Sequence, residues 1–271
     1  MSRTLVPAVL DVIHRAGVII EAVRRSDMQV AQKLGDAGPV TRADREADAL
    51  LKSKLLTLLP AAWLSEETAD DRARLSTERV WIVDPLDGTK EFVAGIPEYA
   101  VAVALVEHGQ PVLGAVHNPV TAQTVWAVRG EGAYVVSDNR APADAKRVAV
   151  TDGNRLLASR SEIKRGEFEP LRSSWEVVPV GSIEWKLALI AMGQAAATVS
   201  RGPKHEWDVC AGALLIQEAG GIATEALGDP LMYNRPRPKV AGILAGSHEA
   251  HARLLAQVKQ IGVSDRMAEL G

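Results

Sequence analysis

The chain has little of what several classes of protein require. Its one cysteine, Cys210, excludes a disulfide within the chain and favours a reducing compartment, the cytoplasm. Its 31 basic and 34 acidic residues nearly balance, so the net charge does not predict electrostatic binding to nucleic acid or to anionic lipid. The apolar run from Leu187 to Ser200 is too short to cross a bilayer. We therefore expect a soluble protein that neither binds a nucleic-acid polymer nor inserts into a membrane.

The rest of the composition is that of an ordinary globular protein, with 47% apolar and 24% charged residues. A length of 271 residues predicts one large domain or two intimate ones, since a domain usually has roughly 100–200 residues. The polar stretch 137–144 is the best candidate boundary. We expect an N-terminal half at residues 1–140 and a C-terminal half at residues 141–271.

Hydrophobic spacing predicts a helix pair followed by a sheet in the first half. Apolar residues recur at helical spacing between Leu5 and Leu34, where a glycine-rich stretch stops the helix. Thr41 can cap a second helix that Pro60 ends. Short apolar runs predict strands at 79–84, 99–106, 112–117, 124–128 and 133–136, the last four as two hairpins. A meander with helices on one side is typical of an α+β fold.

The second half alternates between strand and helix patterns. We expect strands at 156–159, 177–180, 196–200 and 240–245, and helices at 183–192, 208–219 and 248–261. This alternation predicts a mixed, largely parallel sheet.

The densest chemical signal is the segment Asp-Pro-Leu-Asp-Gly-Thr at 84–89, directly after a predicted buried strand. Pro85 stops sheet pairing and forces a turn, which can aim Asp84 and Asp87 at one point. Two such carboxylates repel each other, and one pKa should rise unless a cation lies between them. Oxygen ligands without cysteine or histidine favour magnesium, and the Gly-Thr turn offers backbone N–H groups to an anion. The segment predicts a metal site beside a phosphate, against the alternative of a turn cap and a surface loop.

Three further acidic residues could join this site. Glu66 belongs to a Glu-Glu pair after an apolar stretch, although such pairs are usually solvated. Asp208 stands at the start of an apolar helical stretch, where a helix cap is an equally good interpretation. Asp44 follows Thr41 in the second helix, where an exposed acid is the default expectation.

Together these segments resemble the lithium-sensitive, magnesium-dependent phosphomonoesterases that include inositol monophosphatase and 3'(2'),5'-bisphosphate nucleotidase. The motif at 84–89 matches one signature of that superfamily. Trp207-Asp208, followed by a small-residue helix that ends in Glu-Ala-Gly-Gly at 218–221, matches the other. The resemblance covers nearly the whole chain. It implies a layered αβαβα sandwich of the α+β class, with one antiparallel and one mixed sheet.

The resemblance also implies the metal ligands, and with them two or three magnesium ions. Glu66, Asp84 and the Leu86 carbonyl would hold one ion. Asp84, Asp87 and Asp208 would hold a second, and a third, looser ion would lie near Glu66. The N-terminal half would then carry the metal site and the C-terminal half would bind substrate.

The catalytic groups follow from the same resemblance. Asp44 and Thr89 would position and deprotonate the attacking water, and Glu66 would also belong to the catalytic set. The amides of Gly88 and Thr89 would cradle the phosphate, beside Asp208. Attack by metal-activated water needs no phosphoenzyme nucleophile.

The choice among phosphate esters depends on the residues around this centre. Lys90-Glu91-Phe92 and Ser159-Arg160-Ser161 look more like CysQ-type bisphosphate nucleotidases than inositol monophosphatases. The expected substrate is therefore adenosine 3',5'-bisphosphate or its sulfated form, which would lose its 3'-phosphate. The alternative is inositol 1-phosphate. A homodimer is also expected from the resemblance.

A second phosphate needs cations near the metal site. Besides Lys90 and Arg160, the candidates are Lys204 and His205, each of which could also be a solvated surface charge. Gly181 and Ser182 could present amides to a sugar or phosphate, or could simply cap a helix. Glu162 stands where the nucleotidase branch often has a histidine, and an acid there would repel a phosphate.

Two rival classes fit less well. A haloacid-dehalogenase phosphatase separates its two aspartates by one residue, whereas Pro85 and Leu86 stand between them here. A binding module with a degenerate site would lack at least one of the four acidic segments, and all four are present.

Overall fold

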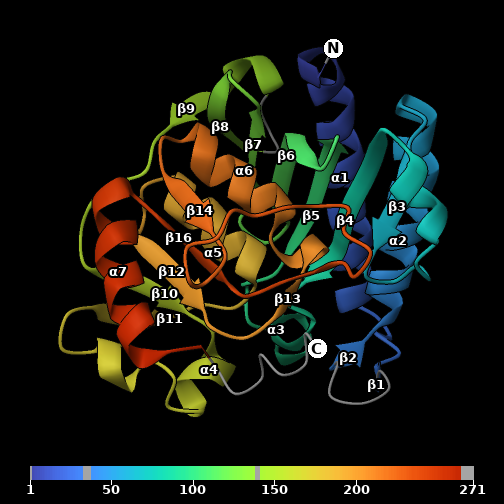
Figure 1. The fold of residues 1–271 in the computed structure, drawn as a ribbon. Coiled ribbons are helices and arrows are strands. Elements are labelled where there is room, and N and C mark those ends of the chain that lie inside the picture. Colours follow the sequence, from blue (N-terminus) through green and yellow to red (C-terminus); the bar gives the residue numbers. More distant parts are fainter. Residues whose placement is uncertain (1, 33–37, 138–140, 264–271) are drawn as a thin grey trace.

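The computed structural model describes residues 2–32, 38–137 and 141–263. Within them, layers of helices and sheets alternate in the order αβαβα, which confirms the expected fold class (Figure 1). The helices are α1 (Ser2–Arg24), α2 (Arg42–Leu58), α3 (Thr89–Ala94), α4 (Arg160–Lys164), α5 (Ile183–Ala191), α6 (Cys210–Glu218) and α7 (His248–Ile261). No helix in these ranges is both long and apolar enough to span a membrane.

The larger sheet has seven strands in the order β3-β4-β5-β6-β7-β8-β9. They are β3 (Ala62–Ser65), β4 (Arg79–Asp87), β5 (Ala100–Glu107), β6 (Gln110–Asn118), β7 (Gln123–Val128), β8 (Gly132–Ser137) and β9 (Lys146–Val148). The five-stranded sheet has the order β11-β10-β12-β16-β14. Its strands are β10 (Arg155–Ala158), β11 (Glu176–Pro179), β12 (Ala197–Ser200), β14 (Ile222–Thr224) and β16 (Ile243–Gly246). Two short ribbons complete the fold, β1 (Ala31–Gln32) with β2 (Pro39–Val40) and β13 (Lys204–His205) with β15 (Lys239–Val240).

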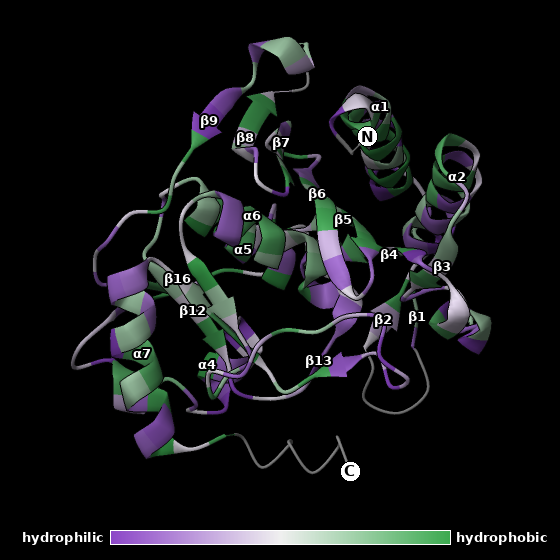
Figure 2. Ribbon diagram, turned by 45° about the horizontal axis from the view of Figure 1, so that its top comes forward, coloured by the Kyte–Doolittle hydropathy of each residue, from purple (hydrophilic) through white to green (hydrophobic). Residues whose placement is uncertain are grey.

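Side-chain alternation along the strands builds two cores on the larger sheet. On β4, Val80 and Ile82 face the layer of α5 and α6, whereas Trp81 and Val83 face α1 and α2. A third core joins α7 to the outer face of the five-stranded sheet. Hydrophobic colour accordingly follows the central strands, and hydrophilic colour appears on the outer helices α2 and α7 (Figure 2). β4, the second strand of the sheet, is buried along nearly its whole length, and its C-terminal part carries Asp84 and Asp87.

Several boundaries differ from the sequence expectations. The first helix ends at Arg24, well before Leu34, because the Ser26 hydroxyl donates to the Ala22 and Val23 carbonyls and closes the last turn. The chain then forms β1, and residues 33–37, where the predicted helix would have stopped, lie outside the described ranges. The predicted strand 240–245 divides, since Lys239–Val240 pairs with β13 while β16 pairs with β12.

The sheets are also less uniform than expected. β3 was not predicted, and it pairs parallel with β4 in a sheet that is otherwise antiparallel. Helices cover both faces of that sheet, where we had expected one face. The five-stranded sheet has two parallel and two antiparallel pairings, so "largely parallel" was wrong. The proposed boundary at residue 140 lies outside the described residues and remains a prediction; β9 extends the first sheet beyond it.

A buried histidine on β6 gives the fold a pH dependence. His117 is 1% exposed and forms a hydrogen bond with Thr124 Oγ1 over 3.0 Å. His14 on α1 bonds the same hydroxyl over 2.7 Å, and the two rings lie 4.9 Å apart. Burial, with the neighbouring His14, lowers the pKa of His117 to about 3. The unfolded chain therefore binds a proton here more readily than the folded protein does.

Acid is expected to destabilise the protein through this group. The depressed pKa means that its stabilising contribution is complete above about pH 6.5 and is lost as the pH falls toward 3. Between pH 6.5 and 5, the free energy of unfolding should fall by roughly 2 kcal/mol more in the wild type than in His117→Gln. Urea unfolding at the two pH values measures the difference. Equal losses in both proteins would contradict a neutral, buried His117.

Candidate active site

A pocket of about 540 Å³ lies where β4 ends and α3, α4 and α5 begin. Its lining combines acidic residues from distant parts of the chain with a group of cationic ones. The acidic residues are Glu66, Asp84, Asp87, Glu91 and Asp208, and the cationic ones are Lys90, Arg160, Lys164 and Lys204. The structure therefore brings all the acids expected to bind metal, together with Leu86, to one cavity.

Strand pairing explains how Glu66 reaches this pocket. β3 runs parallel to β4 with Ser65 opposite Val83. Glu66, the residue after β3, consequently lies beside Asp84, the next residue along β4. Pro85 does not end the strand as we expected: the pairing of β4 with β5 is irregular between Asp84 and Asp87 and resumes where Asp87 lies opposite Ala100.

Asp84 is the most deeply buried of these acids. It is 1% exposed, and its carboxylate accepts a hydrogen bond of 3.0 Å from the Leu86 amide. Burial raises the pKa of Asp84 well above its usual range, and the nearby charges of Glu66, Asp87 and Asp208 raise it further. The direction is the one expected from the sequence, although burial contributes more than like-charge repulsion.

Asp87 is held by the start of α5. Its Oδ2 accepts hydrogen bonds from the Ser182 hydroxyl, at 2.6 Å, and from the Glu184 amide, at 2.7 Å. Burial raises the pKa of Asp87 to about 6, with Asp208 adding to the rise and the two hydrogen bonds opposing it. Asp208 lines the pocket from the 3-10 turn Glu206–Asp208 and accepts a bond of 2.8 Å from the His205 amide. Asp208 thus caps the short 3-10 turn, whereas the cap residue of α6 is Val209, so the interpretation of Asp208 as the cap of the apolar helix is wrong.

Asp44 is not the exposed acid that we expected. It is 1% exposed, at the start of α2, where its Oδ2 accepts bonds from the Thr41 amide and hydroxyl at 2.7 and 2.6 Å. Its Oδ1 accepts a bond of 3.0 Å from the Thr89 hydroxyl. The same hydroxyl lies 3.1 Å from the Leu86 carbonyl. The capping interaction that starts α2 therefore also fixes Asp44 against the turn at 84–89.

The donors at the pocket suit a hard cation. Carboxylates and one carbonyl are magnesium ligands, and neither Asp84 nor Asp87 forms an ion pair with a cationic side chain in the described part of the chain. No three acidic, histidine or cysteine side chains within residues 2–32, 38–137 and 141–263 already form a cage. Magnesium usually binds through one or two carboxylates and completes its octahedral shell with water and phosphate oxygens, so a partial set is the appropriate one.

The turn that precedes α3 adjoins these carboxylates. Gly88 has φ +95°, a left-handed conformation, and a Cβ there would lie 2.9 Å from the Glu98 carbonyl. Glycine is thus required where the backbone passes between the acids and the first turn of α3. Gly88 and Thr89 both line the pocket.

The expected cationic residues differ in how they are held. Lys90 is exposed at the rim. Arg160 makes a two-pronged ion pair with Glu98, with one contact at 3.1 Å, and lies 3.8 Å from Glu91. Lys204 Nζ is 3.7 Å from Glu162. These three line the pocket, whereas the ring of His205 stacks on Trp207 at 4.5 Å and is not part of the lining.

Gly181 and Ser182 line the pocket, where the Gly181 amide and the Ser182 hydroxyl are already engaged. The Gly181 amide donates to Glu98 over 2.6 Å. The Ser182 hydroxyl donates to Asp87 and accepts from the Trp185 amide at 2.9 Å, so it caps α5. The capping alternative is correct for Ser182, and contact of either residue with substrate remains a prediction.

Glu162 does not face the pocket as expected. It is 3% exposed, and its carboxylate accepts a hydrogen bond from Ser200 and pairs with Lys204. Burial would raise the pKa of Glu162, yet Lys204, Lys186 and the hydrogen bonds hold it below its usual range. The acid is therefore ionised, and from outside the lining it pairs with Lys204, which does line the pocket.

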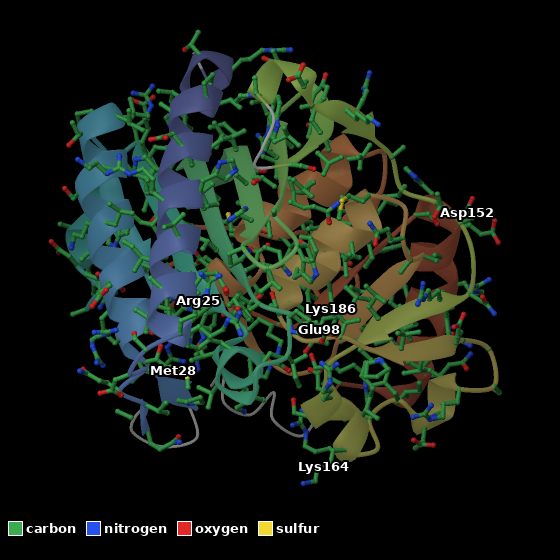
Figure 3. The ribbon with its side chains drawn as sticks, turned by 180° about the vertical axis from the view of Figure 1, so that it is seen from behind. Arg25, Met28, Glu98, Asp152, Lys164 and Lys186 are labelled. Carbon is green, nitrogen blue, oxygen red and sulfur yellow. The ribbon has the colours of Figure 1, made fainter. Side chains whose placement is uncertain are left out.

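Sequence reasoning missed three charged residues beside the site: Glu98, Glu184 and Lys186. Lys186 is buried and donates to the Ser159 hydroxyl over 2.6 Å, and its charge also lowers the pKa of Glu98 (Figure 3). The available signal was the presence of Glu184 and Lys186 inside the apolar segment 183–191. Charged residues are seldom fully buried without partners, so such a segment indicates a buried polar network.

Comparison with known proteins identifies the family. Residues 2–262 match the Inositol monophosphatase family. A 3'(2'),5'-bisphosphate nucleotidase CysQ from Aggregatibacter actinomycetemcomitans is 32% identical over 247 residues, which are 87% of this chain and 89% of that protein. An inositol-1-monophosphatase from Rhizobium meliloti (strain 1021) is 32% identical over 261 residues, 90% of this chain and 95% of that one. The crystal structure of the extragenic suppressor protein SuhB from Bartonella henselae superimposes with a TM-score of 0.81 at 26% identity, covering 95% of this chain and 99% of the other. The chain therefore belongs to the inositol monophosphatase family and is a phosphatase.

Proposed function

We propose that the chain is a magnesium-dependent phosphomonoesterase that removes the 3'-phosphate of adenosine 3',5'-bisphosphate or of its sulfated form. One observation carries the proposal: a single pocket joins the converging acids at Asp84 and Asp87 to a wall of cationic side chains. The acids suit two or three magnesium ions. The cations suit a substrate that carries a second phosphate.

The chain's own groups supply positioning and the proton acceptor. When bound, magnesium stabilises charge on the attacking and leaving oxygens and makes a water molecule more acidic. The Thr89 hydroxyl donates to Asp44 Oδ1, so its oxygen lone pairs are free to accept a proton from that water. As the Thr89 oxygen accepts the proton of the water, the original hydroxyl proton of Thr89 passes to Asp44 Oδ1. The Gly88 and Thr89 amides orient the phosphate for in-line attack.

The wider setting belongs to the same proposal. Lithium inhibition and a homodimer follow from the family resemblance. We place the enzyme in the cytoplasm, because its one cysteine, Cys210, is free and buried within α6. Its substrate is a small phosphate ester.

Hydrolysis of inositol 1-phosphate is the second candidate. Two observations favour it: Glu98 and Glu162 offset part of the charge of Arg160 and Lys204, and the inositol-1-monophosphatase relative is as similar as the nucleotidase.

The bisphosphate is nevertheless the better candidate. Lys90 and Lys164 form no ion pair in the described ranges, which leaves positive charge available for a second phosphate.

A kinetic comparison tests the choice. Phosphate release is measured with adenosine 3',5'-bisphosphate, inositol 1-phosphate and fructose 1,6-bisphosphate, each with magnesium and after chelation. We expect kcat/KM to be highest for the nucleotide, by about tenfold or more, which is what one additional charge-assisted hydrogen bond supplies. Faster turnover of inositol 1-phosphate would establish the alternative, and release that survives chelation would remove the metal from the proposal.

Replacing Lys204 by alanine should weaken the bisphosphate selectively. Loss of one charged contact is expected to lower kcat/KM for adenosine 3',5'-bisphosphate by about tenfold or more and to change that for inositol 1-phosphate by about threefold at most. Lys259→Ala, an exposed lysine on α7, is the matched control. Equal losses on both substrates would exclude Lys204 from recognition of the second phosphate.

A further inference from the structure

Two helix N-termini meet beside the metal-binding acids. α5 begins at Ile183 and holds Asp87 through the Ser182 hydroxyl and the Glu184 amide. α6 begins at Cys210, directly after the turn that carries Asp208. The geometry between these helices therefore sets the distance between Asp87 and Asp208.

Glu184 joins the two helices. It is 0% exposed, and its carboxylate accepts hydrogen bonds from the Ala211 amide at 3.1 Å and the Gly212 amide at 2.6 Å. These amides belong to the first turn of α6, whose own cap residue, Val209, provides no side-chain bond. A buried carboxylate from a different helix thus satisfies the N–H groups that α6 leaves unpaired.

Gly212 has no side chain, which leaves room for the Glu184 carboxylate. A Cβ at position 212 would lie 2.5 Å from Glu184 Oε2 and 2.5 Å from Leu187 Cβ. Gly212 is therefore needed to admit the carboxylate. The Glu184 backbone amide donates to Asp87, and its side chain binds α6, the helix that follows Asp208. One residue therefore links the segments that carry the two acids.

We propose that Glu184 is a positioning residue that fixes Asp87 and Asp208 at the spacing one divalent ion requires. The inference rests on the metal site of the proposed function. Glu184 does not line the pocket. It acts through the N-terminal turns of α5 and α6, because it lies in the first and its carboxylate binds the second. Loss of a residue that orients metal ligands in this indirect way typically lowers metal affinity about 10–100-fold.

Two other roles would leave different signatures. If Glu184 only capped α6, its removal would lower stability and leave ion affinity unchanged. If it acted only through its negative charge, any variant that kept the carboxylate would bind ions normally. Variants that remove the charge and variants that keep it are therefore both needed.

The test measures manganese binding to the metal-free protein by titration calorimetry, without substrate. Glu184→Gln keeps the volume and removes the charge. Glu184→Asp and Gly212→Ala keep the charge and break the contact with α6, since the shorter chain falls short and the added methyl displaces the carboxylate. We expect all three to weaken the most affected manganese site by about tenfold or more. The magnesium concentration for half-maximal phosphatase activity should rise in parallel, with kcat at saturating magnesium within about threefold of wild type.

Ser247→Ala is the control, because it removes the cap of α7, far along the chain from the pocket residues. It should lower Tm and leave manganese affinity unchanged. If Gly212→Ala does not fold, Glu184→Asp alone still tests whether the negative charge is sufficient. Wild-type affinity in Glu184→Gln, or in both charge-retaining variants, would overturn the positioning role and leave the proposed function intact. If the wild-type protein itself bound no manganese, both would be overturned.

Discussion

Replacing Asp84 by asparagine should reduce metal-dependent phosphate release by at least about a thousandfold while the fold is kept. Asp84 is the acid shared by both expected ions, and a metal's stabilisation of the displacement amounts to several kcal/mol, with a tenfold rate change for about each 1.4 kcal/mol. Asparagine has the same shape and its amide oxygen can still accept the bond from Leu86. The loss should therefore appear in kcat and in ion affinity, and not in secondary structure.

The thermal stability of the metal-free protein should rise in Asp84→Asn, although its activity falls. The raised pKa of Asp84 shows that its charged form is disfavoured in the metal-free fold by burial and by three nearby acids. Its contribution to stability is present below about pH 4 and is lost as the pH rises through the raised pKa, so at pH 7 the charge is destabilising. Asp84→Asn should consequently raise the Tm of the metal-free protein, by about 2–4 °C for each kcal/mol relieved.

Asp208→Asn is the companion variant. Asp208 is part-exposed and accepts the His205 amide through one oxygen, a bond that asparagine can keep. We expect a similar loss of activity with a smaller gain in Tm, because less burial is relieved. Phosphate release within a few-fold of wild type in either variant, measured with magnesium in excess, would exclude these acids as metal ligands.

The second large effect concerns proton transfer. Asp44→Asn and Thr89→Ala should each lower kcat by about 10²–10⁴-fold, the range typical of general-base catalysis, and should leave manganese affinity close to that of wild type. The reason is that the Thr89 hydroxyl donates to Asp44 and both act on one proton. Calorimetry separates this outcome from the loss of ion binding expected for Asp84→Asn.

The double variant shows whether the two residues form one unit. Groups that act together are strongly non-additive, so Asp44→Asn/Thr89→Ala should be about as slow as the slower single variant. Multiplied effects would mean that the hydroxyl and the carboxylate act independently. Thr57→Ala, an exposed threonine whose hydroxyl bonds the Ser53 carbonyl, is the control and should retain full activity.

The local part of the site could be predicted from the sequence. Asp84, Pro85 and Asp87 lie within one short segment, and an apolar run that meets a proline predicts the strand and the break in its pairing, although β4 continues past Pro85 to Asp87. The long helices α2 and α7 also agree with their hydrophobic spacing, because periodicity over several turns is a strong signal.

What depended on partners distant in sequence could not be predicted from local patterns, and the grouping of the distant acids with Asp84 came from the family resemblance alone. The four-residue strand β3 is too short to show a pattern, yet its pairing places Glu66 beside Asp84. Asp44 was expected to be exposed because nothing near it in sequence indicates that Thr89 would cover it. The partners of Arg160 and Glu162 are likewise remote, so charges that suggested open recognition are partly neutralised within the fold.

The parallel pairing of β3 with β4 also has a consequence for biosynthesis. A chain emerging from the ribosome can align Glu66 with Asp84 early, whereas the turn that bears Asp208 follows more than a hundred residues later. Contacts this far apart in sequence form late. Complete ion loading must then await near-complete synthesis, so nascent chains stalled before the 3-10 turn should hold manganese weakly.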